Sequence, residues 1–397
     1  MDIKNQFPIF NKNKNFLYLD SASTTLKHKH CISKLNEYNK EYSANIHRSV
    51  YPIAEKATNE FELSRKKVAK FINSNKDEVI FTKNTTEGIN LVAYSWGLSN
   101  LKKDDVILIT KMEHHSNIIP WQFVSKKTGC KLEYVPLNND GSLDMLAFEK
   151  MLTKNVKLLS IIHQSNVLGV INPVEEIIQK AKNNNTKVLI DAAQSISHLK
   201  IDVKLLDCDF LVFSGHKMFG PTGVGVLYGK IDILDDMEPF LFGGQMIDTV
   251  NEQDSTWNNV PMKFEAGTPN IAEVIALGEC VDFISNLGFS SINNHLKELT
   301  DNYLNLLSKF NHINIYGKDL DRGPVISFNF NNIHSYDFCQ IMGQHDVSLR
   351  SGNHCAQPLL NHFNTNFSTR ISFHIYNDLD EINMFEDKLK KTLSLLS

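Results

Sequence analysis

The sequence has no CxxC pair, no apolar run long enough to span a bilayer and no marked excess of charge of either sign. Its 41 basic and 45 acidic residues give a formal net charge of -4, which disfavours nucleic acid and membrane surfaces as partners. The six cysteines are scattered along the chain, a pattern typical of a reducing compartment. Residues 1–8 resemble neither a signal peptide nor a transit peptide. We therefore expect a cytoplasmic protein that acts on a small molecule.

Short β-branched runs alternate with longer amphipathic segments between residues 77 and 229. This alternation predicts an α/β fold in which a mostly parallel sheet is covered by helices on both faces. Residues 223–229 suit an additional strand or a hairpin-like return. The expected strands are residues 79–81, 106–109, 158–162, 187–191 and 210–213.

A different pattern begins after about residue 285. Residues 292–310 and 380–396 are expected to be helices, and residues 325–330 and 369–373 are expected to be strands. The sequence therefore predicts a large domain, 18–284, and a smaller α+β domain, 285–397, joined by an N-terminal segment, 1–17. In α/β sheets ligands bind at the carboxyl ends of the strands, so the polar residues that follow them are candidate site residues.

Asp191 ends one predicted apolar strand, and Lys217 closely follows the next. Taken alone, Asp191 would more often be a helix cap, and Lys217 a surface residue. Lys217 stands among Ser, Gly and His, which favours a partly desolvated amine with a lowered pKa that can attack an aldehyde. Pyridoxal phosphate requires this pair, because lysine forms a Schiff base with its aldehyde and aspartate holds its pyridine nitrogen.

Hydroxyl groups occur where phosphate donors would be needed. The segment 84–90 includes Thr86 at a predicted change from strand to helix, although threonine-rich caps are common. Ser214 and His216 could contact the same phosphate. His114 or His115 could lie over the cofactor ring, and no matching ligand pair is spaced from them, so we expect no metal site.

Cys355 lies in a short, polar, glycine-containing segment, 350–356, which indicates a loop that presents the thiol. Arg350 and His354 would supply positive surroundings that favour a reactive thiolate. The other five cysteines are expected to be small core residues. Arg370 could bind a substrate carboxylate bidentately, although an exposed strand arginine would look the same in the sequence.

Together these motifs resemble the fold-type I, class V aminotransferase superfamily and, within it, the SUF-type (group II) cysteine desulfurases. The resemblance runs over nearly the whole chain, and it rests on the order and spacing of the motifs rather than on any one of them. The motifs are residues 19–22, 47–48, 85–90, 112–115, 163 with 165–169, 191–194, 214–217, 264–270 and 350–355.

The resemblance implies pyridoxal 5'-phosphate as cofactor and a role for each matching residue. The implied cofactor contacts are Lys217 to the aldehyde, Asp191 to the pyridine nitrogen, His114 stacked on the ring, Gln194 to the phenolic oxygen, and Thr86, Ser214 and His216 to the phosphate, with Thr268 reaching in from the second subunit of a homodimer. The implied substrate contacts are Asn166 and Arg370, to which we add Arg350, and Cys355 as the sulfur acceptor.

The implied reaction converts L-cysteine to L-alanine and leaves the sulfur on Cys355 as a persulfide. A sulfur-acceptor protein of the SUF system would then take it for iron–sulfur cluster assembly. Asn353 departs from the family, which usually has a second histidine there. The alternatives are another class V enzyme, such as a selenocysteine lyase, a kynureninase-like hydrolase or a small aminotransferase, and a non-catalytic scaffold. Selenocysteine could also be a second substrate of the same enzyme.

Overall fold

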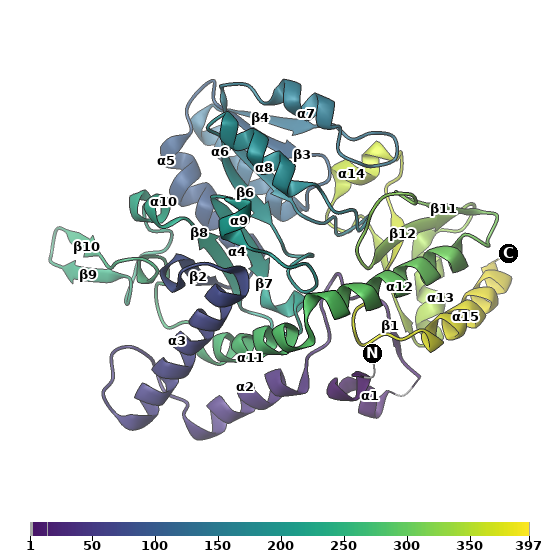
Figure 1. Ribbon diagram of the computed structural model, residues 1–397, viewed down its shortest axis with the longest axis horizontal. Coiled ribbons are helices and arrows are strands. Elements are labelled where there is room, and N and C mark those ends of the chain that lie inside the picture. Colours follow the sequence, from purple (N-terminus) through teal and green to yellow (C-terminus); the bar gives the residue numbers. More distant parts are fainter. Residues whose placement is uncertain (1–2, 14, 397) are drawn as a thin grey trace.

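The computed structural model describes residues 3–13 and 15–396, and a seven-stranded sheet forms its centre (Figure 1). The strand order is β2-β8-β7-β6-β5-β3-β4, and only β8 runs antiparallel to its neighbours. The predicted α/β fold with a mostly parallel sheet is thus confirmed. The strands are β2 (Val79–Thr82), β3 (Val106–Thr110), β4 (Lys131–Val135), β5 (Val156–Ile162), β6 (Lys187–Asp191), β7 (Phe210–Ser214) and β8 (Gly225–Gly229).

The expected strands of this sheet are present, and residues 225–229 form the additional strand, β8. Strand β4 was not predicted. It lies at the edge of the sheet, where only Val135 is fully buried, so its sequence is too polar to stand out as an apolar run.

Helices cover both faces of the sheet. Alternate strand residues point to opposite sides, so each face has its own apolar core. Ile80, Ile107 and Leu189 belong to the core on one face, and Phe81, Leu108 and Ile190 to the core on the other. The first core includes α4 (Thr85–Leu91), α6 (Ile119–Thr128) and α10 (Ile231–Asp236). The second includes α3 (Pro52–Ile72), α8 (Val174–Asn183), α9 (Val203–Leu206) and α11 (Ile271–Leu287).

A smaller antiparallel sheet follows, in the order β11-β12-β15-β14. It is built from β11 (Ile313–Ile315), β12 (Val325–Phe330), β14 (Arg350–Gly352) and β15 (Ser368–Ser372), with α12 (Phe289–Leu307), α13 (Ser335–Gln344), α14 (Gln357–His362) and α15 (Asp380–Leu396). These elements lie together on one side of the molecule in Figure 1. The small β1 (Leu17–Tyr18) pairs in parallel with β13 (Val347–Ser348), so the N-terminal segment joins this part.

The domain division at residues 284 and 285 stays a prediction, and residues 1, 2, 14 and 397 of the predicted segments lie outside the described part. Besides short 3₁₀ helices, the other elements are α1 (Ile9–Lys12), α2 (Lys29–Glu41), α5 (Leu98–Asn100) after a π-helical turn (Val92–Gly97), α7 (Met145–Met151) and the hairpin of β9 (Ile247–Val250) and β10 (Ser255–Trp257). Within residues 3–13 and 15–396, no helix is long and apolar enough to cross a membrane.

A buried ion pair fastens α3 to the edge strand β2. Nη1 and Nη2 of Arg65 lie 2.7 and 2.9 Å from the two carboxylate oxygens of Glu265, and Nη1 also donates to the carbonyl of Val79 at 2.8 Å. The backbone N–H of Phe81 donates to Glu265 at 2.8 Å. The two charged side chains are 1% and 2% exposed, so removing Arg65 would leave the buried carboxylate of Glu265 without a charged partner.

Replacing Arg65 with Met is therefore expected to lower the free energy of unfolding by about 3–5 kcal/mol. Urea unfolding followed by circular dichroism measures this loss. Lys66 is the exposed neighbour of Arg65 on α3, and Lys66→Met should change the same quantity by less than about 0.5 kcal/mol. A loss for Arg65→Met as small as that of Lys66→Met would contradict the role given to the pair.

Candidate active site

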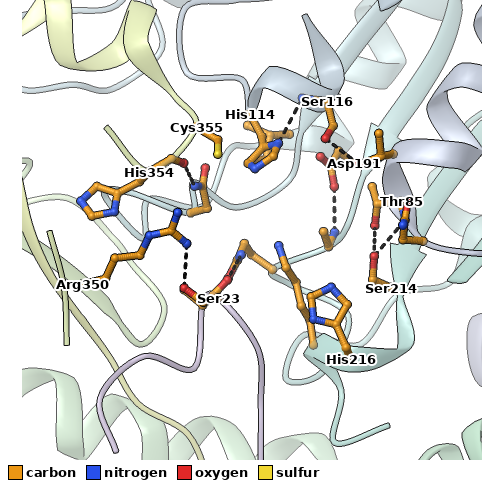
Figure 2. A pocket seen from close by; sticks show the side chains of 18 of the residues that line it. Ser23, Thr85, His114, Ser116, Asp191, Ser214, His216, Arg350, His354 and Cys355 are labelled. Carbon is orange, nitrogen blue, oxygen red and sulfur yellow. Dashed lines mark hydrogen bonds between the residues drawn. The ribbon is translucent and has the colours of Figure 1, made fainter. Parts of the chain in front are cut away.

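A cavity of about 220 Å³ opens where β5, β6 and β7 end, and the small sheet closes its other side (Figure 2). The structure brings all but one of the predicted site residues together around it. These are Thr86, His114, Asn166, Asp191, Gln194, Ser214, His216, Lys217, Arg350, Cys355 and Arg370.

Asp191 and Lys217 stand at the ends of two adjacent strands. Asp191 is the last residue of β6, and Lys217 ends a short 3₁₀ helix, Gly215–Lys217, directly after β7. Burial lowers the pKa of Lys217 to about 8, and Asp191 partly opposes this shift. Burial raises the pKa of Asp191, while the backbone N–H of Ala193, 2.9 Å from Oδ1, and Lys217 lower it. Near pH 7 far more of this amine is therefore neutral than in an exposed lysine.

Hydroxyl groups and a helix start line one end of the cavity. Ser214 Oγ accepts from the backbone N–H of Thr85 at 2.8 Å and lies 2.7 Å from Thr85 Oγ1. Thr86 Oγ1 lies 2.7 Å from Ser116 Oγ. A Cβ on Gly225 would come within 2.6 Å of the Asn84 backbone, so the glycine lets β8 approach the start of α4. This set of donors fits a phosphate.

Small side chains and the neutral imidazole of His114 line the cavity together with the carboxylate of Asp191. Burial lowers the pKa of His114 to about 3, and Lys217 adds to the shift, so the imidazole is neutral. Its Nδ1 accepts from the backbone N–H of Ser116 at 3.1 Å, which puts the ring proton on Nε2. Gln194 donates to the carbonyl of Ala22 at 3.0 Å, and Ala22 and Ala193 leave room in the cavity.

The donor set therefore fits a phosphorylated aromatic aldehyde: an amine for the aldehyde, a buried carboxylate for a ring nitrogen, and hydroxyl groups for the phosphate. Among residues 3–13 and 15–396, no group of three or more His, Cys, Asp or Glu side chains is arranged to hold a metal ion.

Two arginines meet at the opposite end of the cavity. Arg350 of β14 pairs directly with Arg370 of β15, and like charges in such a pair repel each other. Arg370 Nη2 donates to Asp20 Oδ1 and to Ser23 Oγ, both at 2.8 Å, and Arg350 Nη1 donates to the same Ser23 Oγ at 2.9 Å. Asp20 offsets one positive charge, so the site favours one further anion.

Arg370 is 1% exposed, which rules out the alternative of an exposed strand arginine. Its Nη1 donates to the carbonyl of Asn166 at 3.0 Å, while its buried Nε has no hydrogen-bond partner in the described chain. Asn166 Oδ1 is likewise buried and unpartnered there. Unpaired buried polar atoms are costly, and here they lie on residues that line the cavity. Ser23, which the sequence analysis missed, joins the two guanidinium groups.

The Cys355 segment is not a loop throughout. Residues 350–352 form β14, because they complete the edge of the small sheet, and only the residues after them turn. His354 and Cys355 have left-handed φ angles of 48° and 57°, which cost roughly 1–2 kcal/mol per non-glycine residue. Figure 2 shows the Cys355 sulfur directed into the cavity on the side of His114.

His354 does not supply the positive charge that the sequence suggested. It is 2% exposed, and burial, with a contribution from Arg370, lowers its pKa to about 2. Its Nε2 lies 2.9 Å from the carbonyl of Ser368 and 3.0 Å from Ser368 Oγ, so the neutral ring anchors the turn. Arg350 and Arg370 line the cavity together with Cys355 and carry the positive charge that His354 lacks.

Thr268 lies away from this cavity. It lines a separate pocket with Phe81, Glu265 and Asn270 of the same chain, and its Oγ1 accepts from Asn45 Nδ2 at 3.4 Å. Its expected contact with the cofactor of a second subunit stays a prediction.

Glu113, which precedes His114 in the chain, is a buried acid that has no role predicted from the sequence. It is 0% exposed and accepts from Thr110 Oγ1 at 2.6 Å and from Asn117 Nδ2 at 2.7 Å. Burial raises its pKa to about 8, so the carboxyl group is mostly protonated at neutral pH. The hydroxyl and amide partners hold the segment that carries His114.

Comparison with known proteins gives a consistent result. The aminotransferase class-V family model matches residues 17–385. A protein from Halalkalibacterium halodurans described as a probable cysteine desulfurase is 45% identical over 98% of this chain and 97% of its own length. The apo structure of a cysteine desulfurase from Thermococcus onnurineus NA1 has a TM-score of 0.95 and 38% identity, covering 99% of this chain and 98% of that one.

The crystal structure of the cysteine desulfurase CsdA from Escherichia coli, with an S-sulfonic acid, has a TM-score of 0.94 and 32% identity. It covers all of this chain and 98% of its own. The chain therefore matches these proteins along nearly their full lengths.

Because the pKa of Glu113 is raised, we expect the stability of the folded protein to depend on pH through this residue. Its folded-state pKa, about 8, lies above its usual value of 4.5, so unfolding releases a proton between these values. The contribution of Glu113 to stability is thus complete below about pH 4.5 and is lost as the pH rises to about 8. Relative to Glu113→Gln, the free energy of unfolding of the wild type should fall by about 1.4 kcal/mol per pH unit in this interval.

Urea unfolding of both proteins at a series of pH values measures the difference. A flat difference for Glu113→Gln would show that Glu113 is ionised in the folded protein.

Proposed function

We propose that this chain, which belongs to the aminotransferase class-V family, is a pyridoxal-phosphate-dependent cysteine desulfurase that takes sulfur onto Cys355. The observation that carries the proposal is the shared cavity. Cys355, the amine of Lys217 and the arginine pair Arg350 and Arg370 all line it. A thiol, an amine and a carboxylate-binding group are what removal of sulfur from an amino acid requires.

The cofactor would be held by the residues at the sheet edge. Lys217 would hold its aldehyde, Asp191 its ring nitrogen, and Thr86, Ser214 and His216 its phosphate, with His114 and Gln194 beside the ring. When bound, pyridoxal phosphate withdraws electrons from the α-carbon of an amino acid. The lowered pKa of Lys217, about 8, suits its amine to accept and return protons near neutral pH.

The substrate carboxylate would bind between Arg350 and Arg370. A bidentate contact to a guanidinium group would relieve the repulsion between these side chains and satisfy the unpaired Nε of Arg370. The unpaired Oδ1 of Asn166 is an acceptor for the substrate's amino group or for an ordered water.

Cys355 would then act as the nucleophile. Its thiolate attacks the sulfur of L-cysteine, a sulfur–sulfur bond forms, and the bond between the substrate's β-carbon and sulfur breaks. The electron pair left on the β-carbon takes a proton. Atoms balance, because L-cysteine and the Cys355 thiol give L-alanine and the Cys355 persulfide, with no external oxidant or reductant.

The wider role is part of the same proposal. We propose that the chain is a group II enzyme that passes its persulfide sulfur to an acceptor protein of the SUF system for iron–sulfur cluster assembly in the cytoplasm. In a homodimer, Thr268 would contact the phosphate in the partner's site. L-selenocysteine, whose selenium leaves more readily, would be a further substrate.

Other class V activities share Lys217 and Asp191 but do not need a thiol in the cavity. A non-catalytic scaffold would not need the unpaired buried atoms of Asn166 and Arg370, which are costly without a ligand. Cys355 and the arginine pair together therefore favour the desulfurase.

Cys355→Ala is expected to keep the coloured cofactor and to lower alanine release from L-cysteine by at least about 100-fold, because the covalent nucleophile is lost. Mass spectrometry after L-cysteine treatment should detect one added sulfur on Cys355 of the wild type. Lysis of L-selenocysteine should survive in the variant.

Cys339→Ala is the matched control, since Cys339 is also a half-buried free thiol of the small domain but does not line the cavity. It should retain both turnover and the persulfide on Cys355. Wild-type turnover of L-cysteine by Cys355→Ala would instead point to a different class V reaction.

A further inference from the structure

The backbone at Cys355 is in a conformation that ordinary residues adopt only under constraint. His354 and Cys355 are consecutive left-handed residues, and neither is glycine. Such geometry persists where surrounding contacts hold it, and it is common at functional sites. The contacts on either side of Cys355 therefore show what aims its thiol.

Asn353 makes two hydrogen bonds within the turn formed by residues 353–356. Its Oδ1 accepts from the backbone N–H of Cys355 at 3.0 Å, and its carbonyl accepts from the N–H of Ala356 at 2.9 Å. The first of these bonds is an Asx turn, in which a short side chain replaces a backbone acceptor. The side chain of Asn353 thus fixes the backbone of Cys355 directly.

His115 lies outside this turn and makes hydrogen bonds to Cys355 and Gln357. Its backbone N–H donates to the carbonyl of Cys355 at 2.7 Å, and its ring Nε2 accepts from the N–H of Gln357, at the start of α14, at 3.2 Å. Acceptance at Nε2 requires a neutral ring, and burial lowers the pKa of His115 in that direction. His115 follows His114, so one segment contacts both the cavity and the Cys355 turn.

We infer that His115 and Asn353 are positioning residues for sulfur transfer, which together hold the left-handed turn that keeps the Cys355 sulfur in the cavity. The inference rests on the proposed function. Neither residue lines the cavity, so each acts through the backbone around Cys355 rather than on the substrate. Asn353 also has a defined task here, in the position where a histidine was expected.

The test compares His115→Phe and Asn353→Ala in the cofactor-loaded enzyme. Each variant removes one side-chain acceptor, so we expect the turn to open. The iodoacetamide alkylation rate of Cys355 should rise at least about threefold, because the thiol becomes more accessible. Single-turnover persulfide formation should fall about 10- to 100-fold, because the sulfur is misplaced. The dissociation constant of L-cysteine, followed by cofactor absorbance, should stay the same.

Three further variants make the result specific. His115→Gln and Asn353→Ser each place a side-chain oxygen where the lost acceptor was and should recover most of the loss. His362→Phe is the matched control, because the ring of His362, on α14, also makes one hydrogen bond to the backbone, at the carbonyl of Asn138, and does not touch the turn. It should match the wild type in every measurement.

Peptide mass spectrometry separates local from global effects. The buried thiols of Cys31, Cys130, Cys208 and Cys280 should keep their slow alkylation. Faster alkylation of these along with Cys355 would overturn the inference, as would unchanged rates at Cys355 or no recovery in His115→Gln and Asn353→Ser. If the wild type forms no persulfide, the proposed function fails, and the alkylation rates still decide whether the turn is held as inferred.

Discussion

Lys217 and Asp191 carry an amine and a carboxylate into a region where burial opposes both charges. Each is stabilised in part by the other, and this interaction requires that they meet at one edge of the sheet. Parallel neighbours such as β6 and β7 end at the same edge, so their following residues come together. The antiparallel β8 between β7 and β2 makes β2 parallel to β7, which brings Thr85, at the start of α4, to Ser214 at that same edge.

The edge of the large sheet forms one side of the cavity, and the small sheet forms the other. A short N-terminal segment connects the two sides. The backbone of residues 17–21 pairs with β13 and with Ser372 in the small domain. The next residues connect both parts, because Ala22 accepts from Gln194 and Ser23 accepts from both arginines. A shift of this segment would therefore alter the cofactor side and the carboxylate-binding side at once.

The residues that could be predicted from the sequence are those whose position follows from strand order. Asp191 ends an apolar strand, and Lys217 and Thr86 follow within a few residues of one, so their meeting at one edge needed no further information. Contacts made through the backbone of distant segments have no such signal. The pairing of Arg350 with Arg370 depends on strand register, and the edge strand β4 is too polar to recognise. The protonation states of His354 and Glu113 depend on how deeply each side chain is buried, and the neighbouring residues in the sequence do not show this.

His354 shows how burial changes the meaning of a motif. A histidine beside a reactive thiol is normally taken as a source of positive charge, but this ring is neutral and bonded to Ser368. The two arginines supply the charge instead, and they cannot lose it near neutral pH. Arg350 and Arg370, on paired strands, provide the positive charge, and Asn353 and His115 hold the backbone around Cys355. His354, the residue before the thiol, therefore needs only to anchor the turn. An asparagine in place of a second histidine is therefore compatible with a working nucleophile.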